Sequence, residues 1–106
     1  MRVLLDECLH KRLKRELVGH EARTAPEMGW ASRRNGELLA LAVGHFEAFL
    51  TAARNLSYQQ DLSPFDIAVA VLVARSNRLD DLRGLVPRLL EVLPTAARRT
   101  VTLVQR

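Results

Sequence analysis

The run Ile67–Ala74, which reads IAVAVLVA, limits the possible folds more than any other stretch of the sequence. An unbroken apolar run rich in valine is typical of a strand whose two faces are both covered. Strands of this kind belong to parallel sheets, because the crossover connections of such sheets place helices over both faces. The run therefore predicts a buried strand inside a mostly parallel sheet.

Strand-like and helix-like segments alternate along the rest of the chain. We expect the strands to be Arg2–Leu5, His20–Ala25, Phe46–Thr51, Ile67–Ala74 and Thr100–Val104. Leucines at helical spacing predict helices over His10–Val18, Glu37–Val43 and Leu79–Leu93. Alternation of this kind predicts an α/β fold of three layers, with a mostly parallel central sheet of four to five strands and helices on both faces.

Local signals refine two of these segments. Asn77 with Asp80 three residues later resembles a capping box at the start of the last helix. Gly84 and Pro87 inside that helix predict a kink or a split. The polar segment Arg54–Pro64 predicts a loop or a single turn.

Length and composition bound the class of protein. A chain of 106 residues is expected to form one domain over residues 1–106. Cys8 is the single cysteine, which excludes an internal disulfide and a cysteine-rich zinc site. The sequence holds no apolar run long enough to cross a membrane and no signal-peptide pattern, so we expect a cytoplasmic protein without membrane association.

The formal net charge of +4 favours polyanionic partners such as nucleic acids. Abundant arginine, alanine and leucine also arise from a genome-wide composition bias, and both explanations remain open.

Two carboxylates, Asp6 and Glu7, follow the first expected strand directly. Ligands of open parallel sheets bind beyond the carboxyl ends of the strands, so Asp6 is expected to face such a crevice. Glu37 lies in the first turn of its helix. Clustered oxygen ligands suit Mg²⁺ or Mn²⁺, which can activate water for attack on a phosphodiester. Each carboxylate also has a structural interpretation, because aspartate caps turns and glutamate stabilises helix N-termini.

A family resemblance is carried by four segments, LLDECL, HEARTAPEMGWASRRNGELLALA, FLTAARNLSYQQDL and VLVARSNRLDDL. Together they make nearly the whole chain similar to the small PIN-like proteins of the DUF5615 group. That group resembles the toxin nucleases of bacterial toxin–antitoxin pairs, which are metal-dependent ribonucleases of PIN fold. The resemblance implies a PIN-like fold, catalytic and metal-binding roles for Asp6 and Glu37, and an RNA substrate.

The third acidic residue of the family normally stands in a Thr-x-Asp-Arg/Lys-Asp/Asn turn. The corresponding turn here is Thr51-Ala52-Ala53-Arg54-Asn55, so Ala53 occupies the position of the expected aspartate. Losing a residue that fixes a metal or water commonly removes several kcal/mol of transition-state stabilisation. We therefore expect weak or absent activity, either because the lineage lost catalysis or because the aspartate was replaced to express a toxic protein.

The leading hypothesis is a metal-dependent endoribonuclease toxin that Ala53 has weakened or inactivated. The side chains expected to contact RNA are Arg33, Arg34, Arg54, Arg75 and Arg78. The side chains expected to complete the lining of the site are Glu7, Thr51, Asn55 and Asn77.

The alternative hypothesis is a non-catalytic PIN-like module that binds an antitoxin, itself expected to bind DNA, through a sheet edge or an apolar surface. A homodimer is compatible with both hypotheses. A phosphoacceptor receiver domain needs an aspartate after the third strand and a lysine near the end of the fifth. The chain has Ala53 at the first place and no lysine beyond Lys14. A P-loop enzyme is excluded because the sequence lacks G-x-x-x-x-G-K-[ST].

Overall fold

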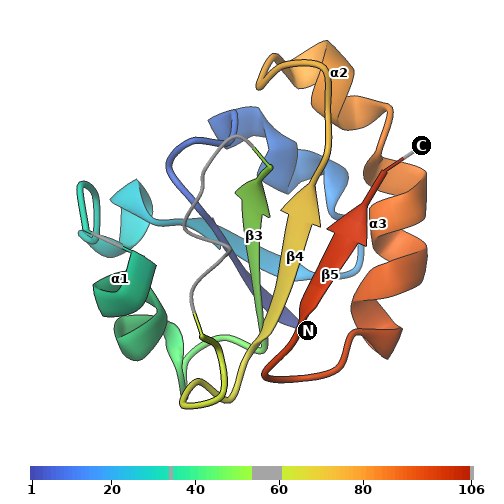
Figure 1. Cartoon of the computed structure of the whole chain (residues 1–106). Coiled ribbons are helices and arrows are strands. Elements are labelled where there is room, and N and C mark those ends of the chain that lie inside the picture. The colour runs from blue at the N-terminus through green and yellow to red at the C-terminus, as the bar shows by residue number, and fades with distance from the viewer. Residues whose placement is uncertain (34, 54–60, 106) are drawn as a thin grey trace.

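A computed structural model describes residues 1–33, 35–53 and 61–105. Its five strands form one parallel sheet in the order β2-β1-β3-β4-β5 (Figure 1). The strands are β1 (Arg2–Leu5), β2 (Glu21–Thr24), β3 (Ala48–Ala52), β4 (Ala68–Leu72) and β5 (Val101–Val104). The expected α/β fold with a mostly parallel central sheet is confirmed. Most of the expected Arg54–Pro64 loop lies outside the described residues.

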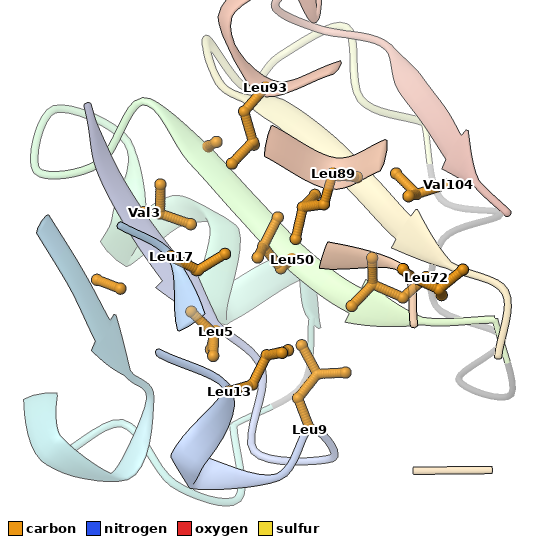
Figure 2. Packing of buried hydrophobic residues seen from close by; sticks show 14 of the residues in the cluster. Val3, Leu5, Leu9, Leu13, Leu17, Leu50, Leu72, Leu89, Leu93 and Val104 are labelled. Carbon is orange, nitrogen blue, oxygen red and sulfur yellow. The ribbon is translucent and has the colours of Figure 1, made fainter. Parts of the chain in front are cut away.

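Alternation along the strands divides the core in two, because successive side chains of a strand point to opposite faces of the sheet. One face carries a cluster that we call the first core (Figure 2). Its strand members include Val3, Leu5, Leu50, Leu72 and Val104. The opposite face carries the second core, whose strand members include Leu4, Phe49, Val69 and Val71.

Helical segments cover both faces and so complete three layers (Figure 1). The first core is covered by η1 (Lys11–Glu16), α2 (Leu79–Arg83), α3 (Val86–Val92) and η4 (Leu93–Thr95). The second core is covered by α1 (Asn35–Ala42), through Leu38, Leu39 and Ala42. A short turn of helix, η2 (Pro26–Met28), follows β2.

The segment expected as an α-helix over His10–Val18 is instead the 3₁₀-helix η1. Its leucines are buried as expected, with Leu13 fully covered in the first core. The side chain of His10 accepts a hydrogen bond from the N–H of Arg12, and the N–H of Leu17 donates to the carbonyl of Lys14. The His10 bond caps the start of the segment. The Leu17 bond, like that from the N–H of Leu13 to the carbonyl of His10, spans three residues, which is the spacing of a 3₁₀-helix.

The predicted split of the last helix is confirmed, because α2 ends at Gly84 and Pro87 lies in the first turn of α3. The capping box expected from Asn77 and Asp80 is wrong. Residue Arg78 caps α2 without a side-chain hydrogen bond, and the Oγ of Ser76 accepts from the N–H of Arg78 at 3.1 Å. The same hydroxyl donates to Asp81 in the first helical turn at 2.5 Å, so Ser76 links the N-cap residue to that turn.

A long-range ion pair joins two of the helical segments that cover the first core. The Nε of Arg83 on α2 lies 2.6 Å from the Oε1 of Glu16, the last residue of η1. This pair links segments that are 67 residues apart in the sequence.

The sheet has two edges, β2 and β5, and the second leaves apolar side chains open to solvent. Leu103 on β5 is 52% exposed, and Val73, directly after β4, is 36% exposed. The last strand of the chain, β5, is thus one of these edges. None of the helices among the described residues combines the length and apolar character that a membrane crossing requires.

Two leucines in strands, one buried and one half-exposed, should differ sharply in how much their truncation lowers the free energy of unfolding. Truncation by Leu50→Ala, at a fully buried position, should lower the free energy of unfolding by about 2–5 kcal/mol. The matched change Leu103→Ala, at a half-exposed position, should cost under about 1 kcal/mol. Chemical denaturation measures both values, and equal losses would contradict the assignment of the core.

Candidate functional site

The sheet has one topological switch point, between β1 and β3. The chain leaves β1 for β2 on one side and returns to β3 on the other. Crevices that bind ligands form at such points, beyond the carboxyl ends of the strands. Asp6 follows β1 directly and Ala53 follows β3 directly, so both lie at this point. The N–H of Asp6 donates to the carbonyl of Leu50 at 2.9 Å, which extends the strand pairing to the carboxylate-bearing residue.

The carboxylate of Asp6 is buried and held by a hydroxyl group. Asp6 is 4% exposed and Thr51 is fully covered. The Oγ1 of Thr51 donates to the Oδ2 of Asp6 at 2.7 Å, across the pair β1–β3. Buried carboxylates are costly unless they are hydrogen-bonded, so this contact fixes where the Asp6 side chain points.

Cys8 is a third member of this cluster that the sequence did not indicate. Its Sγ lies 3.5 Å from the Oδ2 of Asp6 and 3.7 Å from the Oγ1 of Thr51. Burial raises the pKa of the Cys8 thiol, and the negative charge of Asp6 raises it further. The thiol is therefore held in its neutral form, as a weak donor towards the carboxylate.

The alanine at position 53 packs into the protein and brings no oxygen to the switch point. Its N–H donates to the carbonyl of Leu72 at 2.9 Å, and its side chain packs against the second core. The residue is half-buried. A methyl group therefore follows the carboxyl end of β3, two residues after Thr51, at the position where the family resemblance implies a carboxylate.

Glu37 lies at the same edge of the sheet, because α1 begins after β2 and runs back to the start of β3. A hydrogen bond from the N–H of Ser32 to the Oε1 of Glu7, 3.0 Å long, ties the segment before α1 to the residue after Asp6. The Glu37 side chain is 58% exposed and pairs with Arg33 at 3.7 Å. A joint role of Asp6 and Glu37 in holding a metal stays a prediction.

The remaining expected residues are spread around the carboxyl edge. Arg33, Arg75 and Arg78 are exposed, and Asn77 is half-buried. Arg75 lines a hollow of about 230 Å³ beside Asp80 and Asp81, beyond the end of β4. Contact of these arginines with RNA stays a prediction. The expected contacts from Arg34, Arg54 and Asn55 lie outside the described residues.

The side chains present fit a bound metal ion poorly. Within residues 1–33, 35–53 and 61–105, no group of three or more histidine, cysteine, aspartate or glutamate side chains is arranged to hold one. Mg²⁺ takes one or two protein carboxylates in near-octahedral geometry. At the switch point Asp6 supplies one carboxylate, and Ala53 supplies none.

A groove of about 490 Å³ opens one strand away from this cluster, between η1 and the corner where β2 leads into η2. Four cationic and two anionic side chains line it, which gives the lining a net charge of +2. The lining residues are Glu7, Leu9, Lys11, Arg12, Lys14, Arg15, Thr24, Pro26 and Glu27.

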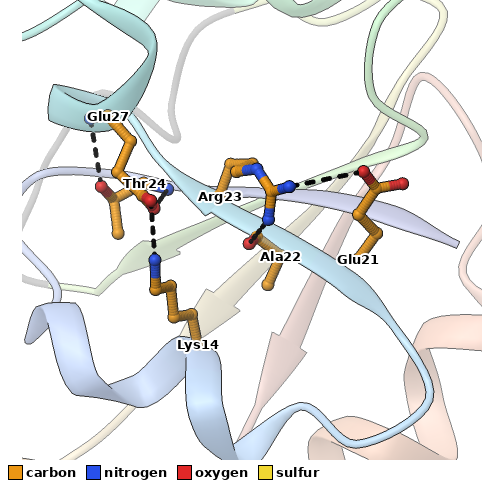
Figure 3. Close-up of polar contacts among 6 residues, drawn as sticks. All are labelled: Lys14, Glu21, Ala22, Arg23, Thr24 and Glu27. Atoms are coloured by element: carbon orange, nitrogen blue, oxygen red, sulfur yellow. Dashed lines mark hydrogen bonds and ion pairs between the residues drawn. The ribbon is translucent and has the colours of Figure 1, made fainter.

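An ion pair spans this groove. The Nζ of Lys14 on η1 lies 2.7 Å from the Oε2 of Glu27 on η2 (Figure 3). The Oε1 of Glu27 accepts from the N–H of Thr24 at 2.8 Å, and the Oγ1 of Thr24 accepts from the N–H of Glu27 at 3.3 Å. These reciprocal bonds form a capping box, which Thr24-Ala25-Pro26-Glu27 could have indicated from the sequence.

Comparison with known proteins returned no matching family model, no matching curated protein and no matching solved structure.

Removing the hydroxyl that holds Asp6 should destabilise the fold. The change Thr51→Val keeps the shape of the side chain but deletes the 2.7 Å donor to Asp6. We expect the free energy of unfolding to fall by about 1–3 kcal/mol, as when a buried charged group loses a donor. The matched change Thr102→Val, on half-buried edge strand β5, should be nearly neutral. Denaturant titration compares them, and a neutral Thr51→Val would refute the role of this bond.

The ion pair between Lys14 and Glu27 should stabilise the fold to an extent that depends on pH. Hydrogen bonds from Lys14 and Thr24 lower the pKa of Glu27 below its ordinary value of 4.5. A carboxylate whose pKa is lowered in the folded state stabilises the fold at pH values above its ordinary pKa. This stabilisation is lost as the pH falls through the lowered pKa. Glu27→Gln should therefore be less stable than the parent at neutral pH, by under about 1 kcal/mol because the pair is part-exposed.

The stability difference between the parent and Glu27→Gln should close as the pH is lowered from 4.5. Thermal unfolding across this range measures it. Lys14→Gln should weaken the same pH dependence, and a difference that grows on acidification would contradict the assignment.

Proposed function

We propose that this chain is a PIN-like, nucleic-acid-binding protein of the toxin–antitoxin type, whose metal-dependent ribonuclease activity is weak or lost because position 53 is alanine. One observation carries the proposal. A buried carboxylate, Asp6, is held by Thr51 at the switch point of a parallel sheet, and Ala53 follows the end of the neighbouring strand β3. The family resemblance of the sequence supplies the type of activity.

The geometry supports half of a hydrolytic site. Asp6 is oriented by the sheet and by the hydroxyl of Thr51, which is the preorganisation that a catalytic carboxylate needs. The neighbouring strand end offers no second carboxylate, since Ala53 carries a methyl group. A divalent cation and an attacking water would need that second group to be held in place, so the chain with Ala53 is expected to hydrolyse RNA poorly.

A specific surface favours the second role, binding of a partner protein. Val71 pairs with Leu103 across β4 and β5, and Val73 lies two residues further along the same face. Leu103 and Val73 are both partly exposed at this edge. An antitoxin segment that added a strand to β5 or covered these side chains would bury them. This role is compatible with the first one.

A receiver-domain function is disfavoured, although the strand order β2-β1-β3-β4-β5 is shared with flavodoxin-like proteins. The position that would accept a phosphoryl group is Ala53, which has no nucleophilic oxygen. The sequence contains no lysine beyond Lys14.

Restoring the missing carboxylate tests the catalytic proposal. Ala53→Asp should raise Mg²⁺- or Mn²⁺-dependent cleavage of a labelled RNA by roughly a hundredfold or more over the parent, in line with the loss when one stabilising group is removed. The same variant should gain thermal stability on addition of Mn²⁺, whereas the parent should gain little. Ala53→Asn, which has nearly the same shape without the charge, should behave as the parent.

The double variant Asp6→Asn with Ala53→Asp separates this site from a contaminating nuclease, because it should be inactive. A folded Ala53→Asp protein that neither cleaves RNA nor responds to Mn²⁺ would rule out the hydrolase and leave the partner-binding role. Cleavage by the parent at the rate of Ala53→Asp would show that Ala53 does not limit activity.

A further inference from the structure

We propose that the groove between η1 and the β2–η2 corner binds the phosphate backbone of a single-stranded nucleic acid and leads it to the carboxyl edge beside Asp6. The inference rests on the proposed function in that its ligand is a nucleic acid, but it requires no cleavage. Of the arginines expected to contact RNA, the three that the structure describes, Arg33, Arg75 and Arg78, do not line this groove.

The geometry of η1 sorts its side chains into rows. In a 3₁₀-helix, residues three apart lie one above the other. Lys11 therefore stacks with Lys14, and Arg12 stacks with Arg15. The third row consists of Leu13, which is buried in the first core, and Glu16, which pairs with Arg83. The inward row anchors the segment, and the two cationic rows line the groove.

Three of these four cations are available to a ligand. Lys14 is engaged by Glu27 at 2.7 Å. Lys11, Arg12 and Arg15 are exposed, and none of them forms an ion pair within the described part of the chain.

Both carboxylates of the lining already have partners. Glu7 accepts from the N–H of Ser32, and Glu27 accepts from Lys14 and from the N–H of Thr24. An incoming anion therefore meets uncompensated positive charge, which is the condition for favourable release of counterions from a phosphate backbone.

The groove lies close to the switch point along the chain and in the sheet. Glu7 and Leu9 line it and follow Asp6 almost directly. Thr24 lines it at the end of β2, where it pairs with Leu5 of β1. A nucleic-acid strand lying along η1 therefore approaches the β1 end that carries Asp6, so the groove is placed to deliver a phosphodiester to the candidate site.

The lining favours the backbone over the bases. Among the described residues its lining contains no aromatic side chain on which bases could stack. Arginine guanidinium groups match phosphate oxygens in pairs, and such contacts do not depend on base sequence. We therefore expect RNA and DNA single strands to bind with similar affinity.

The test is equilibrium binding of a fluorescein-labelled oligouridine to the full chain, measured by fluorescence anisotropy at several salt concentrations. Arg12→Gln with Arg15→Gln should weaken binding roughly tenfold at low salt, and should flatten the slope of log affinity against log salt by about 0.7 for each phosphate that the variant no longer neutralises. Arg88→Gln with Arg98→Gln removes the same charge from residues outside the groove and should bind like the parent. Circular dichroism and thermal unfolding check that both variants are folded.

Loss of affinity confined to the Arg12 and Arg15 variant, with labelled oligothymidine binding like oligouridine, would support the inference. Equal affinities of the two charge variants, or no binding of the parent at low salt, would overturn it. Stronger competition by polyglutamate than by unlabelled oligouridine would also overturn it and assign the groove to an acidic protein. An inactive Ala53→Asp variant leaves this result untouched, so the two proposals fail separately.

Discussion

Two-sided burial of the interior strands is the constraint on which the structure depends. Every residue of β3 and of β4 is buried, because η1, α2 and α3 cover one face of the sheet and α1 covers the other. Such strands can carry polar chemistry only near their ends. Thr51 is the polar residue that lies within them, and it is accommodated because its hydroxyl donates to Asp6. The carboxyl edge is therefore where this fold can place a site.

The same constraint explains why alanine is tolerated at position 53. A second carboxylate beside Asp6, without a cation between them, would bring like-charge repulsion into a half-buried place. Alanine removes that repulsion and packs against the second core instead. Ala53 thus stabilises the folded chain when no cation is bound, although it is expected to weaken hydrolysis. Such an opposition between stability and function is common at active sites.

The sequence predicted what depends on local pattern. The bounds of β1 match the expectation because its apolar run is stopped by two carboxylates, and the split near Gly84 follows from backbone chemistry alone. The 3₁₀ form of η1 was missed, since leucines spaced by four favour an α-helix and only Leu13 of the three lies within η1. The bond from Thr51 to Asp6 joins residues 45 apart and could not be read from spacing. The pairing of Glu37 with Arg33 is by contrast a local contact, four residues apart, which the spacing of the charges could have indicated.

The contact between Arg83 and Glu16 adds a tertiary interaction to η1, which has little stability by itself. A single short 3₁₀ segment has few internal hydrogen bonds and little cooperativity. Its hold on the protein comes from Leu13 below and from α2 beside it. The basic segment η1 is therefore held in part by α2, whose Arg83 lies 67 residues after Glu16 in the sequence. During synthesis the contact between Glu16 and Arg83 can form only after residue 83 has left the ribosome, well after η1 itself has been made.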